Sequence, residues 1–257
     1  MTQLHGLTIE QQLAWERDGF LVMESFLSAE ELATYNQGLD DAFATKASRA
    51  TTVSELAKLN HVEQATGIIE YDQMFMDLME HPRMMNVMRD VFGDAFLMVD
   101  NEGMLKHPGQ KSHTNWHRDT SSLIVTNGKV TPFMVKVFYF LSDVPYDGGC
   151  LAFLPGSHHM RDDMLPRTDN PDDLPGHVRM NVKAGTAVLF NGHTYHSALN
   201  NHSNQVRRSI IYNYGPLFLR TWPSYEPSES LKARAETQLT KMLLGMLPWM
   251  ADPKVFS

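Results

Sequence analysis

A short group of possible metal ligands, His117-Arg118-Asp119, is followed 77 positions after Asp119 by His196. Alternate residues of an extended chain point to the same side, so His117 and Asp119 can reach one ion while Arg118 faces away. Two imidazoles and one carboxylate on one face of an iron(II) ion leave its other coordination positions open for small reactants. The leading hypothesis from these residues is a ferrous site for oxygen chemistry, with His117, Asp119 and His196 as ligands.

A candidate anion-binding residue, Arg207, follows His196 by eleven positions. It opens residues 207–214, whose β-branched and aromatic second half predicts a strand. An arginine on the inward face of a strand needs an anion, and a carboxylate that accepts two parallel hydrogen bonds is its natural partner. Because adjacent strand residues face opposite sides, a shift of register would give this role to Arg208. Arg207 is the preferred choice.

The elements that must position these residues follow from local patterns. Capping-box sequences at Thr8 and Ser28 predict two N-terminal helices, separated by a short strand over 20–23. Further helices are predicted over about 81–91 and 227–247. The predicted strands cover residues 96–106, 114–119, 134–142, 150–154, 179–182, 186–190 and 207–214.

Two polar stretches without a clear period interrupt this pattern. Residues 44–63 are rich in small side chains and are expected to form a mobile loop over the site. Residues 157–176 predict a long connection at the mouth of the β-structure, where such segments often act as lids.

Four blocks in a fixed order carry a family resemblance. They are Asp18-Gly-Phe-Leu-Val22 with the residues around it, Trp116-His-Arg-Asp119, Gly148-Gly-Cys-Leu-Ala-Phe-Leu-Pro-Gly-Ser-His158, and the segment from His196 to Arg207. The sequence resembles the phytanoyl-CoA dioxygenase family of iron(II)/2-oxoglutarate-dependent oxygenases over most of residues 7–214. The resemblance implies a mainly β fold with flanking helices, whose core is a double-stranded β-helix, a cupin-like jelly roll.

The resemblance also implies cofactors and residue roles. The expected cofactors are iron(II), 2-oxoglutarate as co-substrate and O2, with His117, Asp119 and His196 as catalytic metal ligands. Arg207 would pair with the distal carboxylate of 2-oxoglutarate, and Ser209 and Lys106 would be further contacts to it. The expected reaction is hydroxylation of an unactivated carbon in a small-molecule metabolite, with release of succinate and CO2. Desaturation, epoxidation and ring closure are alternatives that use the same cofactors.

Two other classes of protein compete with this interpretation. His113 and His117 would share one face of a helix, as in a zinc hydrolase, but no Glu lies between them and the flanking residues are typical of extended chain. A non-catalytic binding protein of the same fold is the other class. The intact ligand and arginine positions argue against it.

Several residues near the proposed ligands have less specific roles. His193 and His202 are rivals of His196 and are expected to be exposed loop residues, whereas His158 and His159 are expected to be structural or lid residues. Trp116 and Trp222 would either wall a substrate pocket or belong to the core or its rim.

Composition sets the remaining expectations. A chain of 257 residues fits one oxygenase domain over 1–257, with a helical part to about 95, a jelly-roll core over 96–216 and a helical tail over 217–257. With 22 basic and 30 acidic side chains, a nucleic-acid partner is not expected. No apolar run approaches the ~20 residues that span a bilayer, so no membrane partner and a cytoplasmic location are expected.

Partners and redox setting are less determined. Cys150 is the single cysteine, which excludes an internal disulfide and suits a reducing compartment. The expected partner is a small-molecule substrate, and both a monomer and a homodimer fit the sequence. Its acidic balance disfavours a coenzyme A ester, whose phosphates would call for a basic entry surface.

Overall fold

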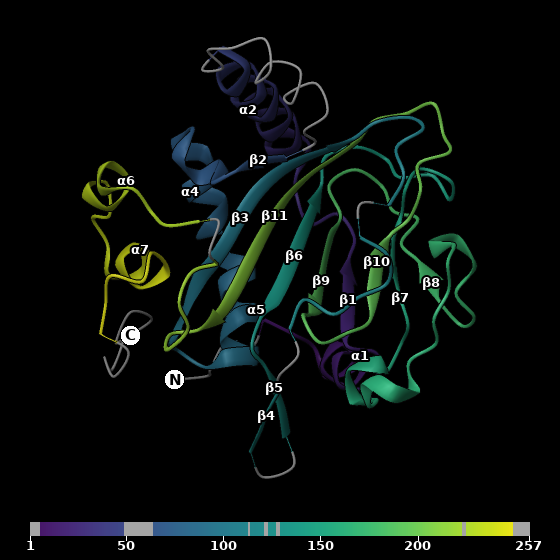
Figure 1. The fold of residues 1–257 in the computed structure, drawn as a ribbon. Coiled ribbons are helices and arrows are strands. Elements are labelled where there is room, and N and C mark those ends of the chain that lie inside the picture. Colours follow the sequence, from purple (N-terminus) through teal and green to yellow (C-terminus); the bar gives the residue numbers. More distant parts are fainter. Residues whose placement is uncertain are drawn as a thin grey trace.

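A six-stranded antiparallel sheet forms the centre of the fold in the computed structural model, which describes residues 6–48, 64–112, 114–120, 123–126, 129–222 and 225–248 (Figure 1). The strand order is β1-β9-β6-β11-β3-β2. These strands are β1 Phe20–Met23, β2 Gln64–Thr66, β3 Phe96–Lys106, β6 Val135–Phe140, β9 Ala187–Asn191 and β11 Arg207–Pro216. A second sheet has the order β10-β7-β8, with β10 His196–Ala198, β7 Leu151–Phe153 and β8 Val178–Arg179. A separate hairpin pairs β4 Leu123–Thr126 with β5 Lys129–Pro132.

Most of the α-helices lie on one side of the large sheet, and the small sheet lies on its other side (Figure 1). The α-helices are α1 Ile9–Asp18, α2 Ala29–Ser48, α4 Gln73–Met79, α5 Pro82–Phe92, α6 Glu229–Ala233 and α7 Gln238–Leu243. The 3-10 helices are η1 Ile68–Glu70, η2 Ser157–His159, η3 Asp162–Met164 and η4 Pro171–Asp173. None of the helices in the described part of the chain combines the length and apolar character needed to cross a membrane.

The core is divided between the two faces of the large sheet. Toward the helices, Tyr212 and Leu189 pack with buried residues of α4 and α5 such as Phe75 and Met84. Toward the small sheet, aromatic side chains fill the space between the layers, and these are Phe138, Phe140, Phe153 and Phe190. Alternate residues of each strand therefore serve opposite cores, as expected for two stacked sheets. The predicted mainly β sandwich with flanking helices is confirmed.

The capping boxes predicted at the N-terminus are present. Thr8 Oγ1 accepts a hydrogen bond from Gln11 N–H, and Gln11 Oε1 accepts one from Thr8 N–H at 2.9 Å. Ser28 and Glu31 form the same reciprocal pair before α2. Each pair satisfies amide groups that have no partner inside the helix, which explains why these helices begin where the sequence predicts.

Other predicted elements differ from the structure. Residues 114–119 form no strand beyond a single bridge at His117, because the N–H groups of Asp119 and Thr120 both donate to Gly192 O. The single helix predicted over 227–247 is two short helices, α6 and α7. The predicted loop over 44–63 was wrong for its first residues, which continue α2 to Ser48, and residues 49–63 lie outside the described part of the chain.

Removing the hydroxyl of Tyr212 should destabilise the junction between β11 and α4. Tyr212 is fully buried and its OH donates to Phe75 O at 2.6 Å. Tyr212→Phe leaves a buried carbonyl with one hydrogen bond fewer, so urea unfolding should show a loss of about 1 kcal/mol. Tyr146→Phe is the control, because Tyr146 is exposed, and its stability should change by less than about 0.5 kcal/mol. Equal effects of the two substitutions would contradict this account.

Candidate metal centre

Two histidines from distant parts of the chain meet at a β-bridge. His117 N–H donates to His196 O, and His196 N–H donates to His117 O, both at 2.9 Å. The imidazole centroids are 4.3 Å apart. Asp119 joins them, with Oδ1 3.5 Å from His117 Nε2 and Oδ2 3.5 Å from His196 Nε2. One donor atom from each of the three residues lies within 4.8 Å of the others, and the described ranges contain no other such group of three or more.

The second nitrogen of each imidazole fixes the orientation of the first. His117 Nδ1 lies 2.8 Å from Asn115 O, and His196 Nδ1 lies 2.9 Å from Thr194 O. A carbonyl only accepts, so each neutral ring carries its hydrogen on Nδ1 and points the lone pair of Nε2 into the cluster. Burial is the main cause that lowers the pKa of His196 to about 3. His196 therefore presents a neutral imidazole nitrogen, the form in which histidine binds a divalent metal ion.

A partly buried lysine, Lys136 of β6, completes the electrostatics of the cluster. Its Nζ lies 3.0 Å from Asp119 Oδ2. Burial raises the pKa of Asp119, but the positive charge of Lys136 is the largest of the opposing effects, and the pKa lies below its ordinary value. Asp119 is thus held as a carboxylate, the form that binds metal ions. Lys136 was not predicted from the sequence, although a lysine inside the apolar run 134–141 was an available signal.

Three more polar side chains on strands lie on the same face as Lys136. Asn213 of β11 is directly opposite both Asp100 of β3 and Lys136 of β6, and Glu102 lies two residues from Asp100. The sequence interpretation missed them as well. Their signal was the alternation of Asp100 and Glu102 inside a long strand with several apolar residues, which places both on one face.

The two adjacent arginines at the start of β11 point to opposite sides. Arg207 is 2% exposed, lies opposite Lys106, and donates from Nη1 to Gly149 O at 2.6 Å. Arg208 instead donates to Asn36 on helix α2 and pairs with Asp40 at 2.7 Å. The pairing of β11 with β6 has no register shift, so Arg207, and not Arg208, lies on the face that carries Lys136.

Lys106 and Ser209 lie beside Arg207 on this face. Lys106 Nζ donates to Lys111 O and Ala198 O, and Ser209 Oγ is buried with no hydrogen-bond partner among the described residues. Gly149 has φ +70°, and a Cβ there would lie 2.8 Å from Lys106 Cδ. A glycine is required at 149 because a side chain would displace the lysine.

The rival histidines have other partners. His193 Nδ1 contacts Thr120 O, and His158 and His159 both contact Glu16 O, which ties η2 to α1. His193 is buried, which differs from the exposed position expected for it. His202 is paired with Asp172. His113 lies outside the described residues, and the residues from Thr114 to His117 form no helix of the kind that the zinc-hydrolase hypothesis needs.

The reverse side of the bridge carries a different pocket. Trp116, Arg118 and Tyr195 line a cavity of about 660 Å³ together with residues of the 157–176 connection. They alternate with His117 and His196, so this cavity lies behind the candidate metal ligands and not over them. Arg118 faces away from the metal cluster, as predicted, and pairs with Asp162. Trp116 donates to Pro171 O and does not wall the metal site.

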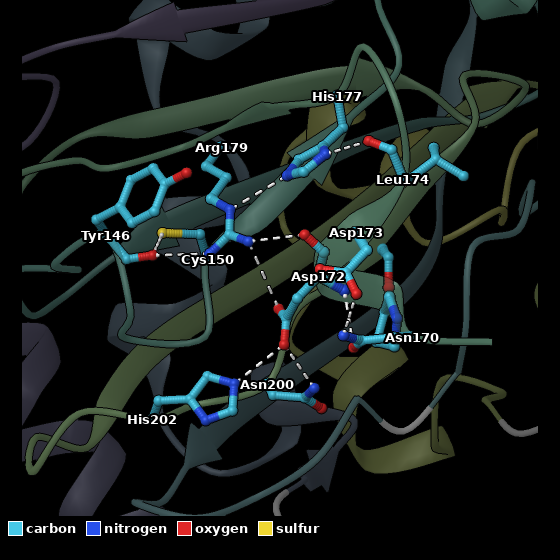
Figure 2. A network of polar contacts seen from close by, with 12 residues as sticks. Tyr146, Cys150, Asn170, Asp172, Asp173, Leu174, His177, Arg179, Asn200 and His202 are labelled. Atoms are coloured by element: carbon cyan, nitrogen blue, oxygen red, sulfur yellow. Dashed lines mark hydrogen bonds and ion pairs between the residues drawn. The ribbon is translucent and has the colours of Figure 1, made fainter. Parts of the chain in front are cut away.

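A polar network fastens the end of this connection (Figure 2). Asp172 Oδ2 accepts hydrogen bonds from Asn200 Nδ2 at 2.7 Å and contacts His202 Nε2 at 3.0 Å. Arg179 of β8 donates to Asp172 O at 2.9 Å and to His177 Nε2 at 3.1 Å. The connection is thus bound to β8 and to the segment that follows β10, next to the strand that carries His196.

Comparison with known proteins now gives the family. The family model of phytanoyl-CoA dioxygenase (PhyH) matches residues 15–209, which make up most of the chain. The chain belongs to the phytanoyl-CoA dioxygenase family. The predicted resemblance is confirmed, and with it the prediction that this protein is a dioxygenase.

Individual relatives share little sequence identity with this chain, but they align with most of its length. Dioxygenase hkm4 of Aspergillus hancockii is 26% identical over 254 residues, covering 92% of this chain and 79% of that protein. L-proline trans-4-hydroxylase of Streptomyces griseoviridis is 23% identical over 232 residues, covering 80% and 85%. HygX from Streptomyces hygroscopicus, solved with nickel and 2-oxoglutarate bound, has a TM-score of 0.69 at 18% identity and covers 88% of this chain and 94% of that one. The structural likeness shows the shared fold.

Glu102 should make the metal-free protein sensitive to pH. Burial raises its pKa to about 7; Asp100 and Asp119 add to this rise, whereas Lys136 and Arg207 oppose it. The pKa of Glu102 is higher in the folded protein than in the unfolded protein. Ionisation of Glu102 therefore leaves the free energy of unfolding unchanged below about pH 4.5 and lowers it increasingly toward pH 7. Glu102→Gln should therefore stabilise the chelator-treated protein by ~3 kcal/mol at pH 8 and by almost nothing at pH 4.5. Urea unfolding at both values measures this, and an equal effect at both would contradict it.

Proposed function

We propose that this protein is an iron(II)- and 2-oxoglutarate-dependent dioxygenase that hydroxylates an unactivated carbon of a small-molecule metabolite, with release of succinate and CO2. The observation that carries this proposal is the convergence of His117, Asp119 and His196, whose donor atoms lie within 4.8 Å of one another. Three protein ligands on one face of an iron(II) ion leave positions open for a co-substrate and O2. The hydroxylase relative from Streptomyces griseoviridis supports hydroxylation over the alternative outcomes.

The residues of the cluster would divide the work of holding the ion. His117 and His196 would bind through Nε2, and Asp119 through a carboxylate oxygen, while Lys136 holds the carboxylate in its charged form. Iron(II), when bound with 2-oxoglutarate and O2, supplies the oxidising power needed to replace a carbon-bound hydrogen by a hydroxyl group. The two carbonyls that accept from Nδ1 fix both rings before the ion binds.

The far end of the same sheet face would hold the co-substrate. Arg207 presents a buried guanidinium there, and Lys106 and Ser209 lie beside it. A buried arginine beside a second cation matches a dianion such as 2-oxoglutarate, whose distal carboxylate can accept hydrogen bonds from a guanidinium. The unused hydroxyl of Ser209 supports its role as a further donor to this carboxylate.

Replacing Asp119 should abolish tight iron binding without unfolding the protein. Asp119→Ala removes the only anionic ligand of the cluster. Loss of a hydrogen bond that supports a metal ligand weakens metal binding by ~10–100-fold, so loss of the ligand itself should weaken iron(II) binding by more than this. Anaerobic titration calorimetry measures the affinity. Asp94→Ala is the control, because this exposed carboxylate pairs only with Arg89 among the described residues, and it should bind iron(II) normally. A folded Asp119→Ala protein with unchanged iron affinity and activity would refute the ligand assignment.

The two adjacent arginines offer a matched test of the co-substrate site. Arg207→Ala should raise the Kd for 2-oxoglutarate at least ten-fold while iron(II) binding changes little, because loss of a buried charge-assisted pair costs ~2–5 kcal/mol. Arg208→Ala should leave the Kd unchanged and lower stability by ~1 kcal/mol, because it loses only its contacts to Asn36 and Asp40. Calorimetric titration with 2-oxoglutarate in the presence of the metal measures both. The reverse result would assign the carboxylate to Arg208.

A further inference from the structure

His117 is the least enclosed of the three candidate metal ligands. Its side chain is 31% exposed, compared with 11% for Asp119 and 4% for His196. In the described part of the chain, main-chain hydrogen bonds join residues 114–119 to their neighbours at two points, the bridge at His196 and the acceptor Gly192 O. The position of His117 therefore needs support from contacts other than strand pairing and burial of its own ring.

Arg118, which lies between His117 and Asp119 in the sequence, binds the 157–176 connection on the reverse side of this segment. Its Nη2 donates to Ser157 O at 2.5 Å and to Met160 O at 2.8 Å, and its Nη1 pairs with Asp162 of the same connection. Only 7% of the Arg118 side chain is exposed. A guanidinium presents its donors in a rigid planar fork, so these contacts to one connection fix its orientation.

Trp116, on the other side of His117 in the sequence, binds the same connection. Its indole Nε1 donates to Pro171 O at 2.8 Å, and its ring packs against Tyr195 and His177. Trp116 is also 7% exposed. Both sequence neighbours of His117 are therefore buried against the 157–176 connection, while His117 itself points the opposite way.

The connection is itself anchored close to the point where it meets Trp116 (Figure 2). Asp172 directly follows Pro171, and its side chain is 13% exposed and accepts a hydrogen bond from Asn200 Nδ2 at 2.7 Å. Arg179 of β8 donates to Asp172 O at 2.9 Å. Because the connection is fixed to other parts of the fold, it can hold the segment that carries the metal ligands.

We propose that Arg118 is a positioning residue for the metal centre. Bound to the 157–176 connection, it holds His117 and Asp119 where they can share one ion, and Trp116 supports it from the other side of His117. This inference rests on the proposed function, because it concerns the metal ligands of that site. Arg118 faces away from these ligands and acts through its two neighbours in the sequence. Without its hydrogen bonds, the segment can turn about the bridge at His196, which moves His117 Nε2 away from the other donor atoms.

The test measures iron(II) binding to the whole protein by anaerobic titration calorimetry. Arg118→Met keeps an apolar stem and removes every donor to the connection. The Kd for iron(II) should rise at least ten-fold, within the ~10–100-fold that loss of a contact supporting a metal ligand costs. The Kd for 2-oxoglutarate at saturating iron(II) should change far less, because Arg207 lies on another strand. Arg118→Lys keeps a charged donor and should recover part of the iron(II) affinity.

Two variants control for lost charge and for lower stability. Arg161→Met removes the same charge from the same connection, at a side chain that is 79% exposed and pairs with Asp163, so it should bind iron(II) like the unchanged protein. Tyr212→Phe weakens the fold on the helix-facing side of the sheet and should also leave the iron(II) affinity unchanged. Trp116→Phe keeps the test usable if Arg118→Met folds poorly, since it removes only the indole N–H, and it should weaken iron(II) binding where Tyr212→Phe does not.

The outcomes separate the two proposals. If the unchanged protein forms no visible charge-transfer band with iron(II) and 2-oxoglutarate, the proposed function fails. If the band forms but the folded Arg118→Met and Trp116→Phe proteins bind iron(II) as tightly as Arg161→Met, the proposed function stands and the positioning role is overturned. An equal loss of affinity for iron(II) and for 2-oxoglutarate would also overturn it, because that result marks a general disturbance of the fold.

Discussion

Two main-chain hydrogen bonds of 2.9 Å between His117 and His196 hold the candidate metal centre together. They join residues 79 positions apart in the sequence, and bridge partners present their side chains on one side, so the two imidazoles meet. Asp119 is positioned in the same way, because its N–H donates to Gly192 O at 2.8 Å. The arrangement of the three candidate ligands is therefore set by the backbone.

The two faces of the large sheet have different roles. The face toward α4 and α5 is almost wholly apolar and supplies most of the buried surface that stabilises the fold. The opposite face combines an aromatic cluster with Lys106 and Arg207 at one end and with Asp100, Asn213 and Lys136 at the other. Charged groups buried in this way destabilise a protein unless they are paired. The stability of the helix-facing core makes that arrangement tolerable.

Much of this arrangement was predictable from short-range patterns. Capping boxes located α1 and α2, and period-two alternation separated Arg118 from His117 and Arg207 from Arg208. The helix α4 was missed because seven residues carry too weak a helical period to stand out, and its Phe75 and Met79 carbonyls are bound by tyrosines of β11 that lie far along the chain. Lys136 was missed for a similar reason, since its importance depends on a contact with Asp119 that no local pattern contains.

The strands β3, β6 and β11 each have hydrogen-bonded neighbours on both sides, so Asp100, Lys136 and Asn213 are carried by interior strands of the sheet and not by surface connections. Exchanging surface connections with a relative would then change access to the pocket but not the substrate preference that the strand side chains determine. Substrate preference would instead diverge through single replacements at alternate strand positions. Each such replacement spares the helix-facing core, because the intervening residues point away from the pocket. This gives the fold a route to new specificity at little cost in stability.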